Sequence, residues 1–209
     1  MNSETFITEH EKLCLRQKIV IIINGKGGAG KDTVCDITEQ FFNTGNISAI
    51  TPIKEIAARY GWQGEKDSRS RKFLSDLKRA FIEYNDLPNN YLLAEYQKFT
   101  RSEKDILFVH IRESDQIDAF KRCINGKCIT LLVRSLKIDG SKIVYGNESD
   151  DNVENYRYDY TYTNEKPLSE LIPDFMDFVY DIFLSEGVIS YDATDLPWRS
   201  DVYLCRGLQ

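Results

Sequence analysis

The feature that most constrains this 209-residue chain is an apolar run that leads directly into a glycine-rich loop. The run "KIVIII", residues 18–23, is short, continuous and rich in β-branched residues. Such a run is typical of a strand that is buried on both faces of a parallel sheet. The loop "NGKGGAGKDTV", residues 24–34, follows at once, and apolar side chains then recur at helical spacing as far as Phe42. We therefore expect a strand–loop–helix unit of an α/β fold.

Strand and helix patterns alternate along the rest of the chain. Further strands are expected at residues 47–50, 106–111, 128–133 and 157–163, with a possible short strand at 142–145. Helices are expected from Pro52 onward and at 67–84, 87–100, 114–124 and 167–183, the last kinked or split at Pro173. This order predicts a three-layer α/β/α fold with a mostly parallel sheet, in one domain that spans residues 1–209.

Composition narrows the classes of partner. The net charge is −6, which argues against binding of long nucleic acid. No apolar run approaches the length of a membrane span, and the mixed, charged N-terminal segment has no signal-peptide core. The five cysteines are odd in number and scattered, so reduced thiols are expected rather than a disulfide framework or a zinc site. We therefore expect a cytoplasmic protein that binds neither nucleic acid nor a membrane.

The loop matches the spacing GxxxxGK through Gly25, Gly30 and Lys31. Glycines let the backbone curl with its amide hydrogens pointing inward, and the helix that follows directs its positive dipole end to the same place. The ammonium group of Lys31 would reach the outer phosphates of a nucleoside triphosphate. The predicted ATP contacts are Gly25, Lys26, Gly27, Gly28, Ala29, Gly30, Lys31, Asp32 and Thr33.

The residue after the lysine departs from the usual loop. Asp32 stands where such loops place serine or threonine, and the hydroxyl comes one residue later, at Thr33. Thr33 can ligate Mg²⁺ directly or through water, and the Asp32 carboxylate can help to hold a hydrated ion. Alternatively, Asp32 only stabilises the first turn of the helix through the dipole.

The sequence "GKDT" resembles the loop of phage-type deoxynucleoside monophosphate kinases and of the animal type of phosphomevalonate kinase. The adenylate kinase loop has the same delayed threonine, with glycine at the position of Asp32. The stretches "TPIKEIAARYGW", "HIRESDQIDAFKR" and "YDYTYTNEKPLSEL" also resemble segments of this superfamily, so that the resemblance spans about residues 18–182.

The resemblance implies a P-loop NTPase fold with a helical acceptor-binding region at about 52–104 and a short lid at about 135–157. It also implies transfer of the γ-phosphoryl group of ATP, with Mg²⁺, to a small phosphorylated acceptor. A nucleoside or deoxynucleoside monophosphate is the leading acceptor, and phosphomevalonate is the alternative. A nucleotide-binding protein without catalysis is the alternative of another class.

An acceptor phosphate needs cations from outside the loop. Arg71 and Lys78 lie within about 20° of each other on a helical wheel, whereas Lys72 and Arg79 point away from the apolar stripe. The resemblance places Lys54 near the acceptor phosphate. For Lys54, Arg71 and Lys78, a solvated helix edge with ordinary ion pairs is the alternative.

The ends of two later strands supply further candidates. Kinases of this kind often carry a magnesium-holding aspartate at the position of His110, for which Glu113 is one substitute. Arg112 is a candidate for the acceptor phosphate, and Arg134 for the adenine or a phosphate, with a structural ion pair as the alternative for Arg134. Arg157 is a second candidate for the lid. The predicted catalytic residues are Lys31, Arg71, Arg112 and Arg134, and the predicted substrate contacts are Lys54, Arg71, Lys78 and Arg112.

Overall fold

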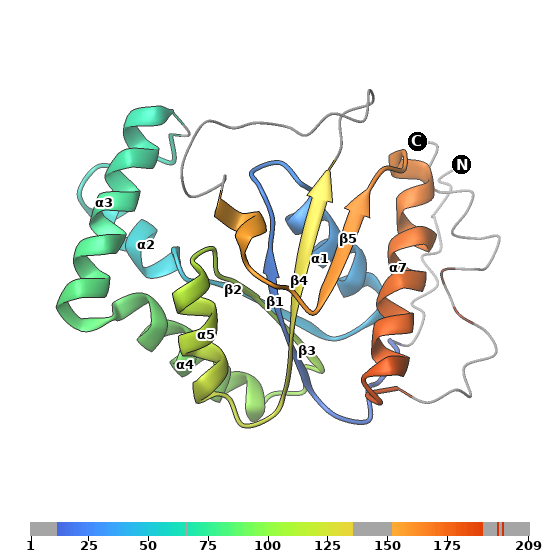
Figure 1. Cartoon of the computed structure of the whole chain (residues 1–209). Coiled ribbons are helices and arrows are strands. Elements are labelled where there is room, and N and C mark those ends of the chain that lie inside the picture. The colour runs from blue at the N-terminus through green and yellow to red at the C-terminus, as the bar shows by residue number, and fades with distance from the viewer. Residues whose placement is uncertain (1–11, 66, 136–151, 190–195, 197, 199–209) are drawn as a thin grey trace, which may run out of the picture.

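A parallel sheet with helices on both faces organises the chain (Figure 1). The computed structural model describes residues 12–65, 67–135, 152–189, 196 and 198. The strands are β1 (Ile19–Asn24), β2 (Thr44–Ser48), β3 (Ile106–His110), β4 (Lys127–Ser135) and β5 (Tyr160–Asn164). The helices are α1 (Lys31–Phe41), α2 (Thr51–Arg59), α3 (Ser68–Asn85), α4 (Leu87–Thr100), α5 (Ser114–Cys123), the 3₁₀ helix η1 (Asn152–Asn155) and α7 (Leu168–Ser185).

The five strands lie in the order β2-β3-β1-β4-β5, and each neighbouring pair is parallel. In this register Ile23 of β1 lies opposite His110 of β3 and Leu131 of β4. The carboxyl ends of the strands therefore share one edge of the sheet, from which the glycine loop, His110 and Arg134 emerge. The predicted three-layer α/β/α fold with a mostly parallel sheet is confirmed.

Strand β1 is buried along its whole length because helices cover both faces of the sheet. Ile19, Ile21 and Ile23 belong to a core shared with α1 and α7. Val20 and Ile22 belong to a second core shared with α4 and α5. Alternating side chains of one strand thus enter two apolar layers, which explains why its sequence is a continuous apolar run and not an alternating one.

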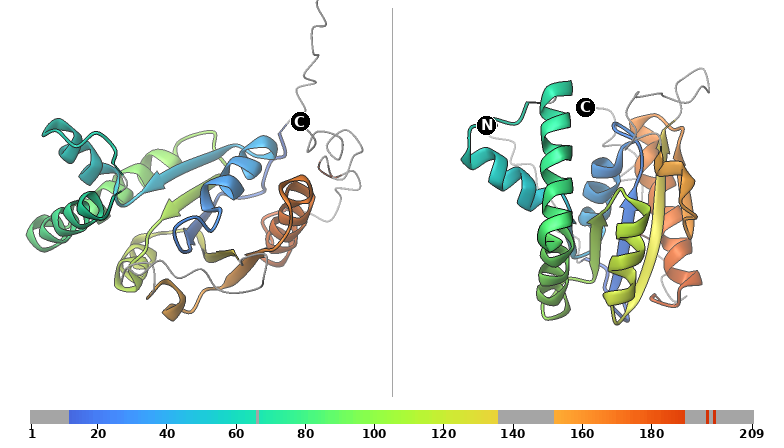
Figure 2. Two further views of the ribbon diagram at one scale, coloured as in Figure 1. Left: turned by 90° about the horizontal axis from the view of Figure 1, so that it is seen from above. Right: turned by 60° about the vertical axis from the view of Figure 1, so that its left-hand side comes forward.

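Helices α2 and α3 project beyond these layers, as Figure 2 shows in its left view. Helix α3 has an apolar stripe, yet Phe73 on that stripe is 46% exposed and Tyr84 is 82% exposed. Its buried residue is a cation, Lys78. The α2–α3 arm therefore presents apolar surface to solvent and is held to the body in part by polar contacts.

Some predicted boundaries were wrong. Strand β2 begins at Thr44 and not at 47, because Thr44 and Gly45 already pair with Ile106 and Leu107 of β3. Strand β5 begins at Tyr160 and not at 157. Helix α7 continues through Pro173 as one helix, without the predicted split. The possible strand at 142–145 and residues 136–151 of the predicted lid lie outside the described residues. Among the described helices, none combines the length and apolar character that a membrane crossing requires.

Candidate functional site

The glycine loop between β1 and α1 contains three backbone conformations that only glycine adopts without strain. Gly25, Gly28 and Gly30 have φ angles of 150°, 74° and 92°. A Cβ atom on Gly25 would lie 2.3 Å from the carbonyl oxygen of Val133, so the loop is pressed against the end of β4. A Cβ atom on Gly30 would lie 3.3 Å from Nδ2 of Asn164 at the end of β5. The loop that follows β1 therefore packs against β4 and against the end of β5.

Lys31 folds its ammonium group back over this loop. Its Nζ atom donates to the carbonyl oxygen of Gly25 at 2.6 Å and to that of Lys26 at 2.9 Å. The side chain thus places a positive charge at the mouth of the loop, where the outer phosphates of a nucleotide would lie.

The start of α1 adds a second source of positive potential. Gly30 caps the helix without a side-chain hydrogen bond, and the first backbone bond to its carbonyl oxygen comes from Val34. The amides of Asp32 and Thr33 precede that bond, so they point out of the helix end as anion donors. The loop, the helix end and Lys31 together form a cradle that fits a polyphosphate.

The candidate protein ligands for a magnesium ion bound with the nucleotide are the Thr33 hydroxyl and the Asp32 carboxylate. Asp32 is exposed and Thr33 is half-buried at the start of α1. Within the described residues, no group of three or more His, Cys, Asp or Glu side chains is arranged to hold a metal. The ion would therefore draw most of its ligands from phosphate oxygens and water, as Mg²⁺ commonly does.

His110 lies at the end of β3 beside the loop. Burial lowers its pKa to about 4, and Lys31 and Arg112 act in the same direction while Asp32 opposes them. Its Nε2 atom is 4.0 Å from Sγ of Cys35 in α1. The imidazole is therefore neutral at pH 7 and adds no negative charge at the position where an aspartate was expected.

Lys78 and Glu113, two residues singled out from the sequence, are joined to each other. Nζ of Lys78 lies 2.5 Å from Oε2 of Glu113, which is the N-cap residue of α5. Glu113, a candidate magnesium ligand, is thus paired with Lys78, a candidate contact of the acceptor phosphate. The pair links α3 to the segment that follows β3.

The predicted arginines are distributed around the carboxyl edge. Arg134 pairs with Glu154 of η1, with 3.4 Å between Nη2 and Oε2, and its buried Nε atom has no hydrogen-bond partner within the described residues. Arg112 is exposed directly after β3. Arg71 on α3 is exposed, as is Lys54 on α2. The structure thus brings Lys31, Arg112 and Arg134 to one edge and leaves the other two on the arm.

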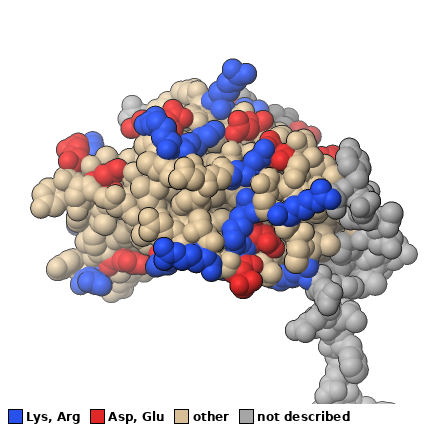
Figure 3. Space-filling view, turned by 90° about the horizontal axis from the view of Figure 1, so that it is seen from below, with Lys and Arg blue, Asp and Glu red and all other residues tan. Residues whose placement is uncertain are grey.

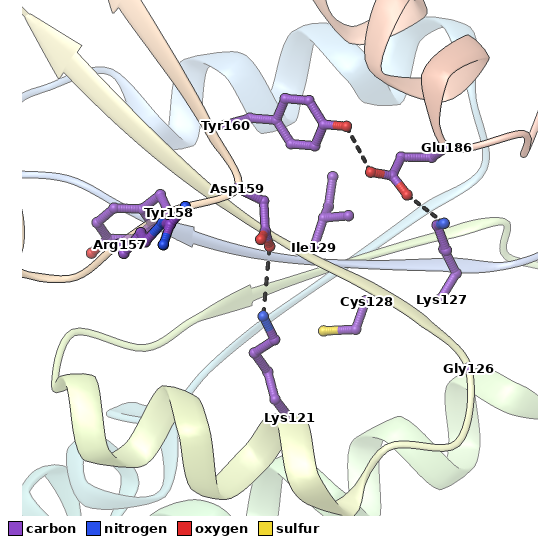
Figure 4. Close-up of a pocket in the computed structure, with 10 residues that line it drawn as sticks. All are labelled: Lys121, Gly126, Lys127, Cys128, Ile129, Arg157, Tyr158, Asp159, Tyr160 and Glu186. Atoms are coloured by element: carbon purple, nitrogen blue, oxygen red, sulfur yellow. Dashed lines mark hydrogen bonds and ion pairs between the residues drawn. The ribbon is translucent and has the colours of Figure 1, made fainter.

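Arg157 lies elsewhere, in an open cavity of about 650 Å³ near the amino ends of β4 and β5 (Figure 4). The other charges of this cavity are paired, because Lys121 lies 3.6 Å from Asp159 and Lys127 binds Glu186. The cavity is therefore a separate feature from the glycine loop, and Arg157 does not join Arg134.

The face at the amino ends of the strands shows basic and acidic side chains interspersed (Figure 3). Both signs of charge occur across the described part of this face.

Asn24 and Tyr158 were missed by sequence reasoning. Asn24 is 1% exposed and accepts a 2.8 Å hydrogen bond from the Gly25 amide through Oδ1. Its Nδ2 atom donates to the Arg112 carbonyl oxygen at 3.1 Å and to the Tyr158 hydroxyl at 2.8 Å. The available signal was a polar residue that ends an apolar strand, since such a side chain must find partners when it is buried.

Comparisons with known proteins find likenesses of shape only. No family model matches the chain, and no curated protein does. A solved structure of TT1252 from Thermus thermophilus is 16% identical, covering 81% of this chain and 98% of that chain, with a TM-score of 0.48. Shikimate kinase from Aquifex aeolicus is 14% identical, with 80% and 99% covered and a TM-score of 0.43. Shikimate kinase from Bacteroides thetaiotaomicron is 15% identical, with 79% and 98% covered and a TM-score of 0.46. At these values the likenesses assign neither a substrate nor site residues to this chain.

Proposed function

We propose that this chain is an ATP-dependent kinase that phosphorylates a small phosphorylated acceptor in the cytoplasm. The observation that carries the proposal is the position of Lys31, whose Nζ atom lies on the carbonyl oxygens of the glycine loop at the start of α1. Arg112 and Arg134 emerge at the same edge of the sheet, so further cations lie on the side where a triphosphate and a second phosphate would meet.

The reaction requires positioning and charge neutralisation more than proton transfer. A phosphate oxygen of the acceptor would bond to the γ-phosphorus while the bond to the β–γ bridging oxygen breaks, and ADP would leave with that electron pair. Lys31 and the loop amides would hold the outer phosphates as charge moves onto the bridging oxygen. Bound Mg²⁺ would supply further neutralisation of the phosphate oxygens.

The α2–α3 arm supports an acceptor site beside the loop. Arg71 and Lys54 are exposed on the arm, and Lys78 ties the arm to the residue after Arg112. Helix α3 leaves much of its apolar stripe exposed, and such an element moves at low free-energy cost. Closure of the arm would exclude water from the reaction. A nucleoside or deoxynucleoside monophosphate is the proposed acceptor, on the resemblance of the loop, and phosphomevalonate is the runner-up.

A nucleotide-binding protein without catalysis is the second candidate. It is favoured by the presence of His110 at the position where an aspartate was expected and by the engagement of Glu113 with Lys78, because both reduce the negative charge available to hold magnesium near the end of β3. This candidate shares the phosphate cradle with the first, so it predicts the same ATP binding but no acceptor-dependent turnover.

ADP release from ATP and Mg²⁺ separates the two candidates. The panel of acceptors contains the nucleoside and deoxynucleoside monophosphates and phosphomevalonate. The kinase proposal predicts one acceptor that raises ADP release far above the rate without acceptor. If no acceptor raises ADP release above the rate without acceptor, and calorimetry shows that ATP binds, the kinase proposal is rejected in favour of the second candidate.

A further inference from the structure

The Asn24 side chain links the glycine loop to the segment after β3 and to the segment before β5. The hydrogen-bonded set of Gly25, Asn24, Arg112, Tyr158 and Val153 is called the relay below. Gly25 N–H can only donate and the Arg112 carbonyl can only accept, so the two ends of the Asn24 amide can bind them in one orientation. The second Nδ2 hydrogen reaches the Tyr158 hydroxyl. Three of the four hydrogen-bonding positions of this buried side chain are thus filled.

Tyr158 extends the relay to η1. Its hydroxyl accepts from Asn24 and donates to the carbonyl oxygen of Val153 at 2.9 Å. Burial raises the pKa of Tyr158 to about 12, so the hydroxyl keeps the proton that it donates. The residue after Val153 is Glu154, which pairs with Arg134. In Figure 1, η1 lies beside the upper part of β1.

We propose that Asn24 and Tyr158 are positioning residues that hold Arg112 and the Glu154–Arg134 pair in register with the phosphate loop. This inference rests on the proposed kinase function, since the register matters only if the loop and both arginines act on the same phosphates. The loop cradle itself is made by Lys31 and backbone amides, whereas the Tyr158 hydroxyl is bound to Asn24 and to the Val153 carbonyl oxygen. Loss of the relay therefore affects turnover more than ATP binding.

A neighbouring tyrosine provides a matched control. The Tyr156 hydroxyl donates to Oδ1 of Asp118 at 2.8 Å, and the rings of Tyr156 and Tyr158 pack edge to face with centroids 5.1 Å apart. Tyr156→Phe and Tyr158→Phe each remove one hydroxyl from the same aromatic pair. Only the second variant breaks the path from the loop to η1.

Steady-state kinetics with the identified acceptor provide the first test. Tyr158→Phe should lower kcat about tenfold or more, with the KM for ATP changed by less than about threefold, because misplaced groups reduce rate before they reduce binding. Tyr156→Phe should keep kcat within about twofold, as expected of a change outside the relay. Equal kcat values for the two variants would overturn the inference.

Hydrogen exchange provides a second readout that does not need turnover. Addition of ATP and Mg²⁺ should slow amide exchange at Val153–Asn155 in the wild type and in Tyr156→Phe, but not in Tyr158→Phe. If the wild type binds ATP and transfers nothing, the proposed function fails while this measurement still decides the relay. Unchanged ATP-linked protection in Tyr158→Phe would overturn it.

A variant at the far end of the relay covers the case in which Tyr158→Phe folds poorly. Glu154→Gln weakens the pair with Arg134 and leaves Asn24 and Tyr158 in place. It should lower kcat with little change in the KM for ATP, and the double variant with Tyr158→Phe should be no slower than the slower single variant. Independent, multiplying losses in the double variant, or full activity of Glu154→Gln, would overturn the inference.

Discussion

Nζ of Lys78 lies 2.5 Å from Oε2 of Glu113, and this ion pair fastens helix α3 to the start of α5. Lys78 is the buried residue of α3, although the helix carries an apolar stripe. A buried ammonium group is stable only beside a counter-charge. The pair therefore helps to set the position of the α2–α3 arm relative to Arg112, which precedes Glu113.

Replacement of Lys78 by methionine should lower the free energy of unfolding by roughly 1–2 kcal/mol, since it leaves the partly buried carboxylate unpaired. The control is Lys72→Met on the same helix. Lys72 pairs with Asp76, but their side chains are 77% and 43% exposed, so this change should cost less than about 0.5 kcal/mol. Urea unfolding of both variants measures the difference, and equal losses would contradict a structural role for the Lys78 pair.

Gly25→Ala should destabilise the protein strongly. The new Cβ would meet the Val133 carbonyl oxygen at 2.3 Å, and the φ of 150° is itself unfavourable for alanine. We expect a loss of roughly 2–4 kcal/mol in the free energy of unfolding, from strain and from displacement of the loop. Thermal unfolding with calorimetry measures it.

Gly61→Ala is the control for that experiment, because Gly61 has a φ of 104° and no atom within 4 Å of the added Cβ. Gly61→Ala introduces the conformational strain without the clash, so it should lower the free energy of unfolding by about 1–2 kcal/mol. A Gly25 variant as stable as the Gly61 variant would show that the loop does not pack against β4 as described.

The first unit of the fold was readable from sequence because its signals are local. The β-branched run, the glycines and the helical spacing up to Phe42 each constrain the backbone within a few residues. The role of Asn24 was not readable in this way. Its partners Arg112 and Tyr158 lie 88 and 134 residues away in the chain, so they are brought together only by the order of the strands.

The same limit applies to α3. A helical wheel places Arg71 near Lys78 but does not say which of the two faces the body of the protein. That choice depends on the position of Glu113 at the start of α5, which lies 35 residues further along the chain from Lys78. In the structure Lys78 is buried and Arg71 is exposed.

Substitution of each candidate magnesium ligand, Thr33 or Asp32, should change the Mg²⁺ requirement of ATP binding to a different extent. If the Thr33 hydroxyl is the ligand, Thr33→Val should raise the Mg²⁺ concentration for half-maximal ATP binding about tenfold, and Asp32→Asn about threefold or less, because an exposed carboxylate acts mainly through water. ATP titrations at a series of Mg²⁺ concentrations measure both values. A larger effect of Asp32→Asn than of Thr33→Val would show that the Asp32 carboxylate, and not the Thr33 hydroxyl, is the ligand.

His110 should make stability depend on pH. Its pKa is about 4 in the folded chain, below the ordinary value of 6.5, so the unfolded chain binds more protons between these values. The stabilisation is complete above pH 6.5 and is lost as the pH falls towards 4. Between pH 7 and pH 5, His110 should account for a loss of about 2 kcal/mol in the free energy of unfolding.

His110→Gln isolates this contribution from that of the carboxylates, which titrate alike in both proteins. The difference between the wild type and His110→Gln should shrink or reverse as the pH falls from 7 to 5 in urea unfolding. A difference that stays constant over this range would contradict a buried, neutral imidazole.

In the proposed reaction, Lys31 and the glycine loop direct the γ-phosphoryl group of ATP to a phosphorylated acceptor. The most direct measurement is transfer of label from γ-³²P-ATP to the acceptors of the panel, with Lys31→Ala as the comparison and Lys72→Ala as the control for a lost surface charge. The wild type and Lys72→Ala should both give labelled acceptor, and Lys31→Ala should transfer label about a hundredfold or more slowly. Transfer that survives in Lys31→Ala at the wild-type rate would contradict it.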